Sequence, residues 1–398
     1  MKELSQTAQA VRASTTLAID ALFKQMKADG IDVIGFGAGE PDFNTPDNIK
    51  EAGIAAIRDN FTRYTPASGI IELRQAICAR LKADCDLDYK PAQIVAASGA
   101  KHALYIALQT LVNPGDEIIL PAPFWVSYYE LIRMVGAVPV VLDATEASHF
   151  KLTAEQLSAA ITPRTKALIL NNPSNPTGMV YSREELQAIG RVCVEKDIYV
   201  IADEIYYHLI YDGKTFTSFP SVSEEVKERT ILINGVSKSY AMTGWRIGFI
   251  AGPEWIVKAS NKLQGQYTSG PCSVSQKAAE AAYTGTQAPV EEMRKAFERR
   301  RDLIVKLAKE VPGFEVNVPE GAFYLFPKCS SFFGKSAGDR KIENSDDLAM
   351  YLLEVAHVAC VGGTSFGAPE CIRMSYATSD ENIVEAISRI KEALSKLV

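Results

Sequence analysis

The sequence predicts an α/β fold with a mainly parallel sheet, followed by a smaller α+β lobe. From about residue 90 to 250, short apolar runs alternate with longer runs of helical periodicity, which is typical of parallel strands covered by helices on both faces. Beyond about residue 288 a charged helix precedes short strands and further helices. Because 398 residues are too many for one ordinary core, we expect a large domain over 48–287 and a small domain made of 1–47 and 288–398.

Short apolar segments supply the strands expected in the large sheet. They cover residues 94–97, 117–120, 138–142, 166–170, 198–202, 231–234 and 247–251. Helices are expected between the first three strands, at 100–111 and 125–135. Two loop signals, Asn-Pro-Gly-Asp at 113–116 and Asn-Asn-Pro-Ser-Asn-Pro-Thr-Gly at 171–178, separate these elements.

The last third of the chain predicts the α+β lobe. A charged helix is expected near 290–310, and two further helices near 345–355 and 380–397. The expected strands are 314–318, 322–326, 357–361 and 371–376.

Composition narrows the class of protein. Hydrophobic residues make up 47% and charged residues 23%, which is ordinary for a globular chain, and a net charge of −6 argues against a nucleic-acid partner. No apolar run approaches the ~20 residues that cross a bilayer, and the N-terminus resembles no secretory signal. Seven scattered cysteines without a CxxC pair, and four dispersed histidines, predict a reducing, cytoplasmic location and no metal site.

One lysine carries the strongest chemical signal. Lys238 lies in the run Ser-Lys-Ser-Tyr-Ala-Met-Thr-Gly-Trp-Arg at 237–246, directly after a predicted strand. A nearby cation or partial burial makes an amine a good nucleophile toward an aldehyde. Since the hydroxyls and Arg246 could hold a phosphate, the run indicates a Schiff base to pyridoxal 5'-phosphate. The alternative is a solvated surface lysine.

Further candidates lie where predicted strands end, which is where open α/β sheets bind ligands. Asp203 could keep a pyridine nitrogen protonated, and Tyr206 could hydrogen-bond the phenolic oxygen of the ring. A helix-capping aspartate and a core tyrosine are the alternative reading. The stiff loop 171–178 could aim Asn175 at a ligand oxygen.

Two other features indicate anion binding. Gly99 and Ala100 stand between a strand and a helix, where small residues let backbone N–H groups approach an anion. Arg373 is a guanidinium in an otherwise apolar run, Ile-Arg-Met-Ser-Tyr. It must pair either with a carboxylate of the protein or with one from a ligand, and the sequence leaves both open.

Together with Gly39, Tyr64 and Trp125, these candidates follow one another along the chain as in a known family. The sequence resembles the class I/II aminotransferases of PLP fold type I in having, in this order, Gly39, Tyr64, Gly99, Trp125, Asn175, Asp203, Tyr206, Lys238, Arg246 and Arg373. Within them, the chain is most similar to the prokaryotic aspartate aminotransferase subgroup. The resemblance covers essentially the whole chain. Its specific parts are the lysine run, the loop 171–178, Ala-Asp-Glu-Ile-Tyr at 202–206 and Arg-Met-Ser-Tyr-Ala at 373–377.

The resemblance implies a role for each candidate. Lys238 is the Schiff-base lysine and proton shuttle, with Asp203 and Tyr206 as the other catalytic residues. The residues implied to bind the cofactor are Lys238, Gly99, Ala100, Trp125, Asn175, Asp203, Tyr206, Ser237, Arg246 and, from a partner subunit, Tyr64. The residues implied to bind the substrate are Gly39, Lys101, Trp125, Asn175 and Arg373.

The reaction implied is transamination between L-aspartate and 2-oxoglutarate, giving oxaloacetate and L-glutamate, in a homodimer with shared active sites. Lys101 would receive the distal carboxylate. Alternatives are an aminotransferase for aromatic, alanine or prephenate substrates, or a PLP β-lyase. Arg12 falls where prephenate-accepting relatives often carry a basic residue, although Ala13 replaces their usual proline. A PLP-binding regulator is disfavoured, because the first ~40 residues are too few for a DNA-binding domain.

Overall fold

The computed structural model describes residues 2–12 and 15–398, and its largest element is a seven-stranded sheet. The strands are β2 (Ile94–Ala97), β3 (Glu117–Ala122), β4 (Val138–Asp143), β5 (Thr165–Asn171), β6 (Tyr199–Asp203), β7 (Thr230–Gly235) and β8 (Gly248–Ala251). Their order is β2-β8-β7-β6-β5-β3-β4. Only β8 runs against its neighbours, β2 and β7, so the predicted α/β class with a mainly parallel sheet is confirmed.

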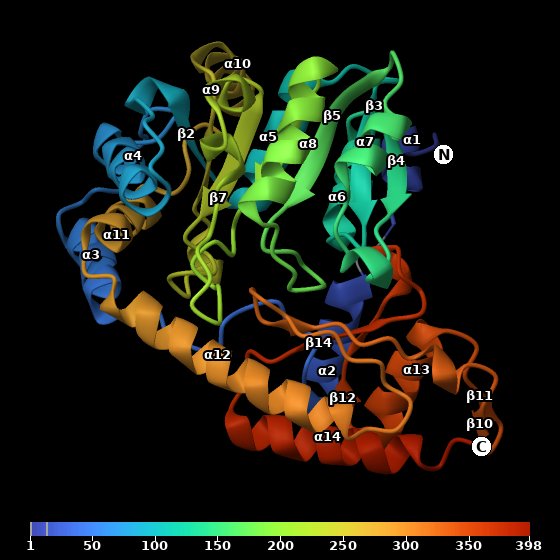
Figure 1. Ribbon diagram of the computed structural model, residues 1–398. Helices are drawn as coiled ribbons and strands as arrows, with labels where there is room; N and C mark the ends of the chain where they lie inside the picture. The colour runs from blue at the N-terminus through green and yellow to red at the C-terminus, as the bar shows by residue number, and fades with distance from the viewer. Residues whose placement is uncertain (1, 13–14) are drawn as a thin grey trace.

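Helices cover both faces of this sheet (Figure 1). They are α3 (Asp47–Arg58), α4 (Ile71–Cys85), α5 (Ala100–Leu111), α6 (Val126–Met134), α7 (Ala154–Ala160), α8 (Arg183–Glu195), α9 (Glu224–Lys227), α10 (Glu254–Tyr267) and α11 (Ser273–Thr284). Side chains alternate between the faces along each strand. Thus Ile118 and Leu120 pack with α5 and α6, whereas Ile119 packs with α8 on the other side. This two-sided burial explains the continuous apolar runs of the strands.

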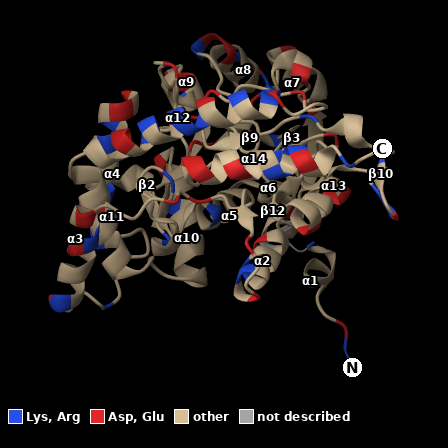
Figure 2. Ribbon diagram, turned by 90° about the horizontal axis from the view of Figure 1, so that it is seen from below, with Lys and Arg blue, Asp and Glu red and all other residues tan. Residues whose placement is uncertain are grey.

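Most of the remaining elements form an α+β lobe below the sheet. Its helices are α12 (Ala288–Lys309), α13 (Ser345–Tyr351) and α14 (Asp380–Leu394), together with α2 (Thr15–Ala28). The N-terminal α1 (Gln6–Ala10) lies instead beside the large sheet, where Arg133 of α6 donates to Ala10 O at 3.1 Å (Figure 1). Its strands are β1 (Ile34–Gly35), β9 (Tyr324–Leu325), β10 (Ser336–Ala337), β11 (Arg340–Lys341), β12 (Val358–Ala359), β13 (Val361–Gly362) and β14 (Ile372–Ser375). Lys and Arg residues are interspersed with Asp and Glu residues along α12 and α14 (Figure 2).

The prediction of a strand over residues 314–318 is wrong. The segment makes one isolated antiparallel bridge, between Glu315 and Lys328, and no ladder. Pro312 and Pro319 bracket it, and proline cannot donate to a ladder. The antiparallel sheet of the lobe therefore has the order β13-β14-β9.

The N-terminal segment packs with the C-terminal lobe. β1 pairs in parallel with β12, with Ile34 opposite Val358. Ile34 and Phe36 belong to one core cluster with residues of α12 and α14, and Tyr206 reaches the same cluster from the other side. These contacts support the division at 48 and 287, which stays a prediction. Within the described residues, no helix is long and apolar enough to cross a membrane.

Two buried glutamines hold the loop between α3 and α4. The side-chain oxygen of Gln276 accepts from Ile70 N at 2.7 Å, and its Nε2 donates to Thr65 Oγ1 at 2.9 Å and to Pro271 O at 2.7 Å. Gln264 Nε2 donates to Ala67 O at 2.5 Å. The loop that follows Tyr64 is thus fixed to α10 and α11.

Replacing Gln276 with methionine is expected to lower the free energy of unfolding by about 2 kcal/mol, because it leaves a buried backbone N–H and a buried carbonyl unpaired. Urea denaturation of the apoprotein measures this. Gln25→Met, on the exposed face of α2, is the matched control and should change little. Equal stability of the two variants would contradict this account of the loop.

Candidate active site

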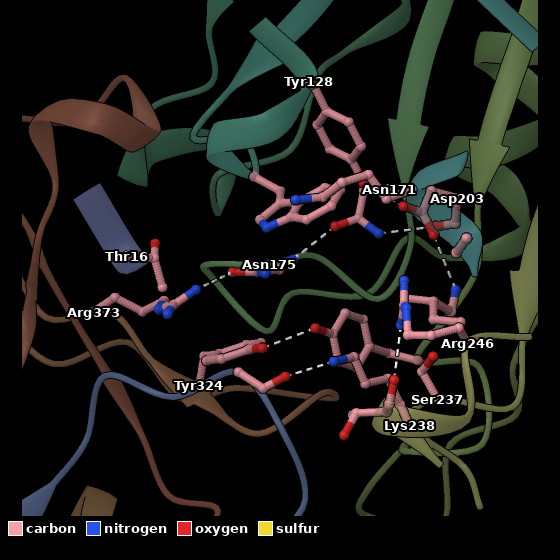
Figure 3. Close-up of a pocket in the computed structure, with 17 residues that line it drawn as sticks. Thr16, Tyr128, Asn171, Asn175, Asp203, Ser237, Lys238, Arg246, Tyr324 and Arg373 are labelled. Atoms are coloured by element: carbon pink, nitrogen blue, oxygen red, sulfur yellow. Dashed lines mark hydrogen bonds between the residues drawn. The ribbon is translucent and has the colours of Figure 1, made fainter. Parts of the chain in front are cut away.

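A cavity of about 270 Å³ opens where the carboxyl ends of β5, β6 and β7 meet the α+β lobe. It is lined by Thr16, Gly39, Ala100, Lys101, Trp125, Tyr128, Asn171, Asn175, Asp203, Ile205, Tyr206, Ser237, Lys238, Thr243, Arg246, Tyr324 and Arg373. Every candidate site residue of the sequence is among them except Gly99 and Tyr64. Figure 3 shows Arg373 and Tyr324 on one side of this cavity and Arg246 and Ser237 on the other.

Lys238 is a half-buried amine on the loop after β7. Its Nζ donates to Gly39 O at 2.5 Å and lies 5.9 Å from the ring centroid of Tyr206. Burial lowers the pKa of Lys238 to about 8; Arg246 and Arg373 act in the same direction, while Glu40 and Asp203 oppose it. The surface-lysine alternative is therefore wrong. An amine with this pKa is a competent nucleophile and proton carrier near neutral pH.

Asp203 ends β6 as a buried carboxylate. Tyr128 Oη donates to its Oδ2 at 2.6 Å, and Ile205 N donates to its Oδ1 at 3.2 Å. Burial raises the pKa of Asp203 to about 6, opposed by these two hydrogen bonds and by Lys238. The group is consequently ionised at neutral pH and can pair with a cationic ring nitrogen in the cavity.

The loop 171–178 is braced against the same strand end. Asn171 Nδ2 donates to Asp203 O at 2.9 Å, and Asn171 Oδ1 accepts from Asn175 N at 2.8 Å. The Asn172–Pro173 and Asn175–Pro176 peptide bonds are both cis. Asn175 is buried and its side chain faces the cavity, as the loop signal predicted.

Arg373 is a fully buried guanidinium on β14. Nη1 donates to Asn175 Oδ1 at 3.0 Å and Nη2 to Gly37 O at 2.8 Å, while its Cζ lies over the rings of Tyr324 and Phe366 at 4.6 and 4.9 Å. Within the described part of the chain none of these partners is a carboxylate. Of the two readings left open by the sequence, pairing with a protein carboxylate is thus not observed. Burial lowers the pKa of Arg373.

A second cluster, opposite Arg373, suits an anion. Gly99 has φ +90° at the start of α5, and a Cβ there would lie 2.7 Å from Arg246 Cζ. Only glycine lets the guanidinium approach this closely. Arg246 Nη1 donates to Thr243 O at 2.8 Å, and Ser237 is buried beside it. The N–H groups of Ala100 and Lys101 precede the first hydrogen bonds of α5, in which His102 N and Ala103 N donate to Gly99 O at 3.1 Å.

Lys101 and Trp125 form the outer wall of the cavity. Lys101 Nζ lies 4.9 Å from the Trp125 ring centroid, and Trp125 packs edge-on against Tyr128 with centroids 5.3 Å apart. Burial, and then Arg246, lower the pKa of Lys101. Lys101 also lines a neighbouring cavity of about 640 Å³, which it shares with Arg12.

Other predicted residues lie apart from this cavity. Tyr64 is 99% exposed and does not line it, so its assignment to a partner's site stays a prediction. Arg12 donates its backbone N–H to Glu130 Oε2 at 3.3 Å. Ala13 lies outside the described residues.

The sequence reasoning missed several lining residues. They are Thr16, Tyr128, Asn171, Ile205, Thr243 and Tyr324. Tyr128 stands three residues after Trp125, one helical turn along, which was a usable signal. Asn171 lies in the predicted loop 171–178 but has no predicted role. Tyr324 lies in the apolar segment 322–326, which predicts only a strand.

Comparison with known proteins gives concordant matches. Residues 31–390 match the family model described as aminotransferase class I and II. The chain is 51% identical to the aspartate aminotransferase of Bacillus sp. (strain YM-2), over 98% of this chain and 99% of that protein. It is 47% identical to the aspartate/prephenate aminotransferase of Cereibacter sphaeroides (strain ATCC 17029 / ATH 2.4.9), over 98% of each. The crystal structure of the aspartate aminotransferase from Rhizobium meliloti superposes with a TM-score of 0.96, at 40% identity and full coverage of both chains.

The lowered pKa of Lys238 gives a prediction for the apoprotein. Acetylation of Lys238 by acetic anhydride, followed by peptide mass spectrometry across a pH series, should have its half-point near pH 8, because burial disfavours the ammonium form. In the urea-unfolded chain the same peptide should titrate near the ordinary value of 10.5. A half-point that is the same in both states would show that the fold does not activate this amine.

Proposed function

Because the chain belongs to the class I and II aminotransferases, we propose that it transfers an amino group between L-aspartate and 2-oxoglutarate, giving oxaloacetate and L-glutamate. The names of its relatives from Bacillus and Rhizobium support aspartate as the amino donor. The single observation that carries it is a pair of cations, Arg373 and Lys101, which line one cavity without a carboxylate partner among the described residues. A dicarboxylic substrate supplies one carboxylate to each.

The cavity fits pyridoxal 5'-phosphate. A phosphate needs hydrogen-bond donors and positive charge, which Arg246, Ser237 and the start of α5 offer, and the space beside Gly99 excludes a side chain there. Asp203 suits a protonated ring nitrogen, and Trp125 offers a flat apolar face. When bound, this cofactor withdraws electrons from the substrate Cα and makes its proton removable.

The protein's own residues would then bind, orient and move protons. Lys238 Nζ would hold the cofactor through its aldehyde carbon, with loss of water, and, once the substrate amine has displaced it, would take and return the proton at the substrate Cα. Tyr206 and Asn175 would hydrogen-bond the ring oxygen. Arg373 would hold the α-carboxylate by two parallel hydrogen bonds, with Gly39 closing over it.

Prephenate is a second candidate substrate. A specific observation favours it: the cavity beyond Lys101 has the apolar side chains of Phe124, Leu131 and Met134 and the cation of Arg12 on its walls. The relative from Cereibacter sphaeroides carries prephenate in its name. A larger substrate with a ring and a second carboxylate could extend into this space.

We further propose that the enzyme acts in the cytoplasm as a homodimer, with Tyr64 from each subunit completing the phosphate site of the other. All seven cysteines are free thiols, which suits a reducing compartment. The 99% exposure of Tyr64 on a loop held by buried glutamines suits a side chain that acts outside its own subunit.

Replacing Lys101 with alanine tests the substrate assignment. Loss of a charge-assisted hydrogen bond should lower kcat/KM for aspartate about 10- to 100-fold, mainly through KM, and should affect an aromatic substrate much less. Steady-state assays with both substrates measure the difference. Lys258→Ala, at an exposed lysine of α10, is the control. An equal loss for aspartate and for the aromatic substrate would refute a contact with the distal carboxylate.

A further inference from the structure

Two buried tyrosine hydroxyls meet at the cavity wall. Tyr206 Oη and Tyr324 Oη lie 2.8 Å apart, and their rings are edge-on with centroids 5.8 Å apart. Tyr206 follows β6, whereas Tyr324 belongs to β9 of the α+β lobe, so this bond joins two distant segments. The pair has a single hydrogen bond, and either oxygen could be its donor.

The charges around the pair decide which oxygen donates. The guanidinium of Arg373 lies 4.6 Å over the Tyr324 ring, and a cation there stabilises negative charge on the phenol and makes its hydroxyl the stronger donor. Burial and then Tyr324 raise the pKa of Tyr206, and Asp203 adds to this rise, while Arg373 lowers it as it lowers that of Tyr324. Because the guanidinium lies over the Tyr324 ring, Arg373 acts more strongly on Tyr324 than on Tyr206. Lys238 Nζ also faces Tyr206, but at 5.9 Å from its ring. Tyr324 is therefore the donor and Tyr206 the acceptor.

This direction leaves the proton of Tyr206 free to point into the cavity. Among the described residues, Tyr324 is the hydrogen-bond partner of Tyr206 Oη, so the free proton has a ligand atom as its natural acceptor. A hydroxyl that accepts one hydrogen bond becomes a stronger donor of the next. The Tyr324 hydroxyl is also confined by the glycine loop, since a Cβ at Gly39 would lie 2.9 Å from it.

We propose that Tyr324 is a positioning residue that couples Arg373, the holder of the substrate α-carboxylate, to the hydrogen bond that Tyr206 donates to the cofactor ring oxygen. The inference rests on the proposed function. When a carboxylate neutralises Arg373, Tyr324 becomes a weaker donor and the hydrogen bond from Tyr206 to the ring oxygen weakens. Occupation of the carboxylate site is thereby transmitted to the cofactor through two hydroxyl groups.

The test is a pH titration of the visible absorbance of the holoenzyme, for the wild type, for Tyr324→Phe and for Tyr351→Phe. A hydrogen bond donated to the ring oxygen competes with the proton that this oxygen shares with the linked lysine nitrogen. Loss of the Tyr324 hydroxyl should therefore raise the pKa of the absorbance change by roughly half a unit. Tyr351, whose Oη donates to Ala393 O at 2.8 Å in the lobe core, is the matched control and should leave it unchanged.

Succinate, a dicarboxylate without an amino group, supplies the second arm. Succinate should raise this pKa in the wild type. The rise should be smaller in Tyr324→Phe, because this variant lacks the hydroxyl that links Arg373 to Tyr206. In a Tyr206→Phe background, Tyr324→Phe should have no further effect on the pKa, since Tyr324 acts through Tyr206.

Three results bear on the proposal in different ways. An unchanged pKa in Tyr324→Phe, or the same increment with and without Tyr206, overturns it. Should Tyr324→Phe fail to hold the cofactor, Tyr324→Met, which also lacks the hydroxyl, takes its place with the same expected rise in pKa, and a wild-type value there overturns the coupling. A wild-type protein that gains no visible absorbance band with pyridoxal 5'-phosphate instead refutes the proposed function.

Discussion

Burial of opposite charges at one edge of the sheet is the constraint on which the site depends. Relative to the unfolded chain, folded Asp203 holds its proton more tightly, so its effect on stability becomes unfavourable as pH rises from 3.8 to about 6. Folded Lys238 holds its proton less tightly, so stability recovers as pH rises from about 8 to 10.5. Between these ranges both groups are charged and both destabilise the fold. The same desolvation makes the amine reactive and raises the pKa of the carboxyl group, which stays ionised at neutral pH.

The architecture offsets part of this cost with hydrogen bonds at Asp203 from two directions. Tyr128 reaches Asp203 from the helix side of the sheet, and Asn171 fixes the backbone at the same strand end. Arg373 comes from β14 of the α+β lobe and closes the cavity. A substrate held by Arg373 therefore touches both parts of the chain, which couples substrate binding to their relative position.

Sequence reasoning located the site well because its residues stand at strand ends in local motifs. The ends of β6 and β7 could be read from apolar runs, and both Asp203 and Lys238 follow them directly. The supporting contacts could not be read in this way. Tyr324 meets Tyr206 across 118 positions, and both look like core aromatics. The sequence predicts strands of the lobe at 322–326, 357–361 and 371–376, where β9, β12, β13 and β14 lie, but not their limits, since these depend on pairing partners and bracketing prolines rather than on local propensity.

Product analysis tests the central claim most directly. The purified protein is incubated with L-aspartate, 2-oxoglutarate and pyridoxal 5'-phosphate, and oxaloacetate, glutamate, pyruvate and ammonia are quantified. The account predicts oxaloacetate and glutamate in a one-to-one ratio, because Lys238 returns the proton while the amino group is retained and passed on. Pyruvate and ammonia as the main products would instead indicate a lyase and contradict the assignment.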